Sequence, residues 1–178
     1  SVQKRLAECL TRLGEFKDAL NMLAAILEKK PMLLEVQIAA AATYQKRGKE
    51  DQGWFERAIF GGRKDKETGQ NRIWGWARLA TTTPKYPKHR KTFFESRFSM
   101  TQTRYESAMA AGGKKRKDTL RLAKQDISYM VRLYPDLGGV EQTERYDRLL
   151  TKIQKASGGK TIGLKEFQPK KSPMATSK

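Results

Sequence analysis

The segment around Gly14 constrains the fold of this chain more than any other stretch. Apolar residues recur at every third or fourth position on both sides of it, which predicts one helix over 2–13 and a second over 15–30. Gly14 is able to take the left-handed conformation that ends a helix, and Pro31 cannot continue one. Ala19 lets the axes of neighbouring helices approach closely. The sequence therefore predicts a helical hairpin.

This hairpin resembles a unit of the tetratricopeptide (TPR) repeat, a helical repeat of about 34 residues. In that pattern Gly stands at the turn, Ala at the helix crossing and Pro at the exit, and these positions fall on Gly14, Ala19 and Pro31. The chain departs from the pattern at Gln3, where the repeat usually has Trp. The resemblance implies one clear unit over about 1–33 and a stack of helical hairpins that offers a binding groove.

The rest of the chain continues the helical pattern with a degraded repeat. Tyr44 and Gly48 lie one period after the first unit, but Gly53 stands where Ala is expected. We expect an all-α protein, a TPR-like right-handed α-solenoid of three to four helical hairpins over 1–156, capped by its last helix. The further helices are expected at 32–47, 50–62, 71–82, 88–111, 118–134 and 140–156.

Three connections are expected to be irregular. Residues 61–69 form a polar link flanked by Gly, and the prolines at positions 84 and 87 predict an extended linker over 83–88. Lys114–Lys117 lengthen the loop of the following hairpin.

After residue 156 the helical pattern stops. We expect a flexible basic tail over 157–178, low in large apolar residues. Within it Ile162, Leu164 and Phe167 alternate like a short strand that could dock on a partner chain.

The net charge of +18 is spread unevenly along the chain. Residues 84–132 hold thirteen Lys and Arg against four Asp and Glu, which is half of the excess. A surface so basic attracts nucleic acid, anionic membrane or acidic protein. Phe94, Phe98 and Tyr105 lie among these charges and could stack on bases, although their shared helical face also suits a core. The expected basic patch consists of Arg90, Lys91, Lys114, Lys115, Arg116 and Lys117.

In TPR domains the first helix of each pair lines the groove, and the resemblance carries these positions onto two helices of this chain. The positions are Lys4, Glu8, Thr11, Arg12, Glu35, Ile38, Ala42, Gln45 and Lys46. Our candidate groove residues among them are Lys4, Glu8, Arg12, Ile38 and Lys46. Glu8 stands where TPR domains that clamp a terminal carboxylate have Asn. The groove is therefore expected to hold an internal segment or a helix.

The sequence contains no complete motif for catalysis or metal binding. Residues 158–161 resemble the end of a phosphate-binding loop, but Gln154 stands where that motif needs Gly. His89 is the only histidine and has no second ligand beside it. Glu144 and Asp147 alternate with arginines, as on a solvated helix face. We expect no enzymatic activity, no cofactor and no metal site.

The single cysteine, Cys9, lies between Leu6 and Leu10 on an apolar helical face, so we expect a small core residue and no internal disulfide. This cysteine usage favours a reducing, intracellular compartment. No apolar run is long enough to span a membrane. The chain does not begin with Met, and we expect it to be a fragment of a longer protein.

These observations favour a protein–protein interaction scaffold, part of a larger protein or assembly, that binds an acidic or amphipathic segment of a partner. The alternative is an RNA- or DNA-binding helical repeat. The two hypotheses differ in surface geometry, because a nucleic-acid binder should present the basic residues of 84–132 on one continuous face with an exposed aromatic side chain.

Overall fold

A computed structural model describes residues 2–168 of the chain and is mostly helical, as the sequence predicted. The elements are α1 (Val2–Leu13), α2 (Phe16–Lys29), α3 (Leu34–Gly48), α4 (Gly53–Phe60), β1 (Gly62–Lys64), β2 (Asn71–Ile73), α5 (Trp76–Thr82), η1 (Thr83–Lys85), η2 (Pro87–His89), α6 (Arg90–Ala110), α7 (Gly113–Leu133), α8 (Val140–Ala156) and η3 (Gly163–Phe167), where η marks a 3₁₀ helix.

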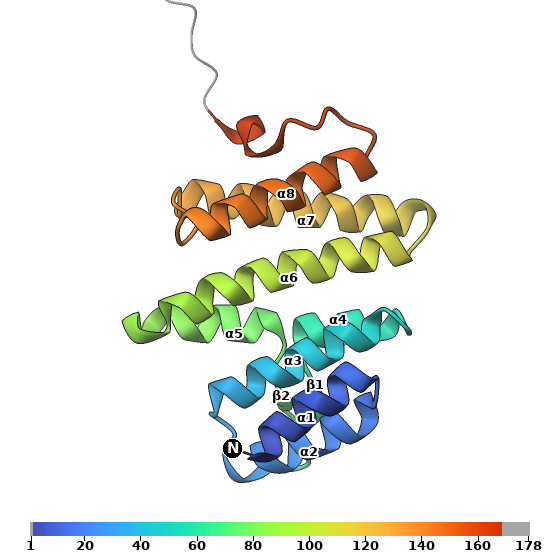
Figure 1. The fold of residues 1–178 in the computed structure, drawn as a ribbon, viewed down its shortest axis with the longest axis vertical. Helices are drawn as coiled ribbons and strands as arrows, with labels where there is room; N and C mark the ends of the chain where they lie inside the picture. Colours follow the sequence, from blue (N-terminus) through green and yellow to red (C-terminus); the bar gives the residue numbers. More distant parts are fainter. Residues whose placement is uncertain (1, 169–178) are drawn as a thin grey trace, which may run out of the picture.

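The helices lie across the long axis of the molecule, with α1 and α2 at one end, α4 and α5 beside each other at one level in the middle, and α7 and α8 towards the other end (Figure 1). Each packs mainly on its neighbours in the chain: α1 on α2, α2 on α3, α3 on α4, α5 on α6, and α6 on α7. Gly14, with φ of +85°, makes the expected turn between α1 and α2. The arrangement is a stack whose long-range contacts are largely between adjacent layers.

The buried apolar side chains form two clusters. The first joins α1 to α5 and the hairpin, and it includes Leu23 and Tyr44. The second joins α6, α7 and α8 and includes Phe98 and Leu150. Met100 of α6 belongs to the first cluster, whereas Phe98, two residues earlier, belongs to the second. Helix α6 therefore connects the two cores.

A small antiparallel hairpin replaces the polar link expected at residues 61–69. Strands β1 and β2 pair with Gly62 opposite Ile73, and the following helix begins at Trp76 and not at position 71. Backbone crowding explains the glycines that flank the strands. A Cβ at Gly61 would lie 2.4 Å from the Ile73 carbonyl oxygen, and one at Gly75 would lie 2.2 Å from that of Ile59. Only glycine allows the two chain segments to approach so closely.

The other two expected connections are helical. The predicted extended linker at 83–88 forms the short helices η1 and η2, with Pro84 and Pro87 in their first turns. Proline is tolerated there because backbone N–H groups in the first turn of a helix make no intrahelical hydrogen bond. Residues 114–117 lie in the first turns of α7, not in a loop. The connection from α6 to α7 is only Ala111 and Gly112.

Residues 163–167, predicted as part of a flexible tail with strand-like alternation, form η3 instead. Leu164 and Phe167 pack against the second core cluster. The Gln154 side chain of α8 fixes the segment, because its Oε1 accepts hydrogen bonds from the Ile162 and Gly163 backbone N–H groups at 2.9 Å each. Its Nε2 donates to Glu166 Oε2 at 2.8 Å. The packed part of the chain therefore extends beyond residue 156, and the rest of the expected tail, residues 169–178, lies outside the described residues.

Candidate partner-binding surfaces

The groove residues inferred from the resemblance lie on α1 and α3, which are side by side. The Thr11 and Thr43 hydroxyls share a buried hydrogen bond of 2.9 Å between these helices. The Lys4 ammonium pairs with Glu8 at 2.9 Å and approaches Glu35 of α3 at 4.0 Å. Two carboxylates therefore offset the charge of Lys4, and this end of the surface presents little positive potential to an acidic segment.

The other three candidate groove residues are not gathered by any contact with this ion pair. Ile38 is half-buried against the first core cluster, whereas Arg12 and Lys46 are exposed. Cys9, expected in the core, is exposed as well. Helix α1 buries Ala7 and Thr11, so its small residues, and not the row with Cys9, face the molecule.

An open groove that the sequence did not indicate lies between α6 and α8. Its cavity has a volume of about 200 Å³. Two apolar side chains of the second core cluster, Phe98 and Leu149, line it, and each is 6 % exposed. Its lining residues are Phe98, Gln102, Tyr105, Glu106, Arg145, Arg148, Leu149 and Lys152.

Two of the charged residues in this groove are already held by intramolecular partners. Arg145 Nη1 donates to both carboxylate oxygens of Glu95, at 2.8 and 2.9 Å, and its guanidinium lies 4.0 Å from the centroid of the Phe98 ring. Glu106 accepts hydrogen bonds from Gln45 at 2.9 Å and Gln102 at 3.1 Å. These bonds fix the walls of the groove.

Glu106 also links this groove to α3. Gln45, which accepts a hydrogen bond of 3.0 Å from the indole N–H of Trp76, is one of the positions that the TPR resemblance placed in the groove. Lys49 approaches Glu106 at 3.8 Å. The acidic charge inside the groove is therefore satisfied from the α3 side.

Arg148 and Lys152 are the cations of this groove that remain available to a ligand. Arg148 pairs with Glu144 at 3.5 Å, but both side chains are more than 60 % exposed, so the pair is weak. Lys152 is exposed, and among the described residues it makes no ion pair. The groove therefore combines two apolar lining side chains, Phe98 and Leu149, with two exposed cations. From the sequence, Arg148 was expected on a solvated helix face, since spacing within one helix does not record which other helix lies opposite.

The expected basic patch is divided between the two ends of the α6–α7 helix pair. Arg90 and Lys91 lie at the start of α6, whereas Lys114–Lys117 lie at the start of the antiparallel α7 (Figure 1). A helix of 21 residues separates them, a length of about 30 Å. Arg90 approaches Asp136 at 3.7 Å. The six residues do not form one continuous surface.

The aromatic residues among those charges are mostly internal. Phe94 and Phe98 are buried, and Tyr105 is half-buried. Tyr86 is exposed and contacts the His89 ring edge-on, with centroids 6.0 Å apart. The aromatic row on α6 is thus part of the core and is not a stacking platform.

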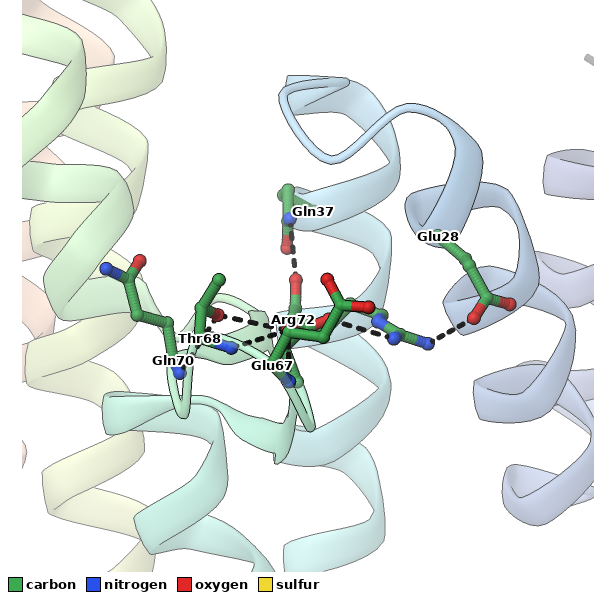
Figure 2. A network of polar contacts seen from close by, with 7 residues as sticks. Glu28, Gln37, Glu67, Thr68, Gln70 and Arg72 are labelled. Carbon is green, nitrogen blue, oxygen red and sulfur yellow. Dashed lines mark hydrogen bonds and ion pairs between the residues drawn. The ribbon is translucent and has the colours of Figure 1, made fainter.

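A larger cavity, of about 790 Å³, lies beside the β1–β2 hairpin, between the end of α2 and the start of α5. Arg72 is one of its lining residues and donates to Glu28 Oε1 and Asp65 Oδ2 at 3.1 Å each (Figure 2). Asp65 in turn accepts hydrogen bonds from the backbone N–H groups of Glu67 and Thr68. These contacts, first those from Thr68 and then that from Arg72, lower the pKa of Asp65 to about 2.

Gln37 secures the inner side of this hairpin. Its buried amide donates to the carbonyls of Pro31 at 2.8 Å and Arg72 at 3.0 Å, and accepts from the Trp74 backbone N–H at 2.8 Å (Figure 2 shows the side chain above Arg72). Arg72 with Glu28, and Gln37 with the hairpin backbone, thus attach the hairpin to α2 and α3. This network serves the fold, whereas Lys64, Lys66, Glu67 and Arg78, which also line the cavity, make no ion pair within residues 2–168.

Across residues 2–168, no group of three or more His, Cys, Asp or Glu side chains is arranged to hold a metal ion. No helix in that range is both long and apolar enough to cross a membrane. Compared with models of known protein families, with curated proteins and with solved structures, the chain has no significant match in any of the three.

Proposed function

We propose that this chain is a protein-interaction scaffold, a TPR-like stack of helical hairpins without enzymatic activity, whose α6–α8 groove binds an acidic amphipathic segment of a partner. The observation that carries the proposal is that two apolar side chains, Phe98 and Leu149, line the groove together with the available cations Arg148 and Lys152. An amphipathic segment would place its apolar side chains against Phe98 and Leu149 and its carboxylates beside Arg148 and Lys152.

The groove is well suited to this task because its walls are already positioned. The bonds from Arg145 to Glu95 and from Gln45 to Glu106 hold both sides without a ligand. A preformed site loses less conformational entropy on binding than a site that must be ordered by its ligand. The net charge of +18 would add attraction for an acidic partner and raise its association rate, in a manner that falls with salt.

The same net charge supports the second candidate, a nucleic-acid-binding repeat. Two observations favour the protein partner: the basic residues are divided between the two ends of α6, and Phe94 and Phe98 are buried. Nucleic acid is therefore included in the test as a competing ligand.

The test measures fluorescence anisotropy of a labelled acidic amphipathic peptide, of its analogue with Lys in place of Glu, and of a single-stranded RNA of similar length. At about 0.15 M salt we expect binding of the acidic peptide alone to survive, because general attraction is screened there. The double variant Arg148→Glu, Lys152→Glu should weaken it about tenfold or more, a loss of roughly 1.4 kcal/mol.

The matched control is Lys17→Glu, Lys30→Glu, which makes the same number of charge reversals at exposed positions of the α1–α2 unit. It should leave the affinity near that of the wild type. Equal loss in both double variants would mean that total charge, and not the groove, binds the peptide. Tighter binding of the RNA at this salt concentration would favour the nucleic-acid hypothesis.

A further inference from the structure

Helix α1 carries an exposed apolar row that the stack does not cover. Val2, Leu6 and Leu13 are 83 %, 50 % and 76 % exposed, and Cys9 between them is also exposed. Their spacing of four, three and four residues places all four on one face of the helix. This face points away from Ala7, which is fully buried against the first core cluster.

The same spacing is the pattern by which two helices pair along a seam. Apolar residues that alternate steps of three and four keep facing a partner helix, with the residues beside the seam free to form ion pairs across it. In α1 the seam residues are Val2, Leu6, Cys9 and Leu13. The groove between α6 and α8 has no part in this surface.

The charges beside the seam specify its occupant. Arg5 and Arg12 each precede a seam residue by one position, on the same flank, where interhelical ion pairs decide which helices associate. Both are exposed, and within residues 2–168 neither makes an ion pair. The nearby Glu8 is held by Lys4 at 2.9 Å. The flank is therefore positive and uncompensated.

A second copy of this chain fits the seam poorly. In an antiparallel pair of α1 helices the arginine flanks would face one another, and like charges at these positions repel. In a parallel pair they would face the opposite flank, which carries Gln3 and Leu10 and offers no carboxylate. Each copy would also bring a net charge of +18.

We propose that the outer face of α1 is a docking surface for an amphipathic helix of another protein, one whose apolar seam is flanked by Glu or Asp. Leu6 and Leu13 would pack into the seam of that helix, and Arg5 and Arg12 would pair with its acidic flank. This is a second interaction surface, distinct in its residues from the α6–α8 groove.

Cys9 makes the proposal directly measurable, because it is the only cysteine in the chain and lies in the seam. The experiment follows its alkylation by N-ethylmaleimide, a neutral reagent whose approach does not depend on the charge of a bound peptide. The probes are two synthetic helical peptides of about three heptads with Leu at the seam, one with Glu and one with Lys on both flanks. At nine-tenths saturation the Glu peptide should slow alkylation about tenfold, and the Lys peptide should not.

The specificity variant is Arg5→Glu, Arg12→Glu, which should exchange the preference, so that the Lys peptide protects Cys9 and the Glu peptide does not. Protection should persist in Arg148→Glu, Lys152→Glu, which distinguishes this surface from the groove. Equal protection by both peptides, no protection by either, or an unchanged preference in the variant would overturn the proposal. Protection that increases with protein concentration without peptide would show that a second copy covers the seam, and would overturn it as well.

Discussion

Gln37 attaches the hairpin to α3 through buried hydrogen bonds. Its amide makes three hydrogen bonds, to the carbonyls of Pro31 and Arg72 and from the N–H of Trp74, in a fully buried position. Gln37→Ala would leave those backbone groups without partners in the interior. We expect a loss of about 2–3 kcal/mol of unfolding free energy, measured by urea denaturation. Gln125→Ala, at an exposed position of α7, is the control and should change stability by less than about 0.5 kcal/mol. A similar small change in Gln37→Ala would show that water replaces the lost bonds.

At the scale of the element, the hairpin depends on an acid whose pKa is displaced. The folded-state pKa of Asp65, about 2, lies below its ordinary value of 3.8, because Thr68 and Arg72 stabilise the carboxylate. Its contribution to stability is therefore complete above the ordinary pKa and is lost as the pH falls from 3.8 towards 2. Asp65→Asn should be less stable than the wild type at pH 6, and the two urea midpoints should converge as the pH approaches 2. Arg72→Gln should show a smaller convergence of the same kind. A constant difference between wild type and Asp65→Asn across this range would contradict the assignment.

The hairpin also shows where prediction from sequence ends. Helices such as 2–13 and 140–156 were predicted to the residue because their apolar periodicity runs for several turns. Strands of three residues are too short to show a comparable period. The hairpin depends instead on Asp65 and on the glycines at 61 and 75, whose contacts join two chain segments that the sequence alone does not place together. For α1 the apolar periodicity was clear but the predicted position of Cys9 in the core was wrong, because the helix packs through Ala7 and Leu10 and turns Val2, Leu6 and Leu13 outward. The α6–α8 groove depends on a contact between helices far apart in sequence, which spacing within one helix cannot record.

At the scale of the whole molecule, the stack consists of two cores joined by α6, and stability should be divided accordingly. In a linear array of packed units each layer depends mainly on its neighbours, so local damage need not spread to the far end. Leu23 and Leu150 allow a matched comparison, because both are fully buried leucines and they belong to different clusters. Each change to Ala should cost about 2–5 kcal/mol.

Hydrogen exchange followed by mass spectrometry would locate that loss. In Leu23→Ala we expect faster exchange in α1 to α4 with α7 and α8 near wild type, and in Leu150→Ala we expect the reverse. Helix α6 should respond to both, since Met100 lies in the first cluster and Phe98 in the second. An equal rise in exchange throughout the chain in either variant would mean that the two cores open as one cooperative unit. If the two cores open independently, the α1 seam and the α6–α8 groove can bind separate partners, because unfolding beneath one surface would not weaken binding at the other.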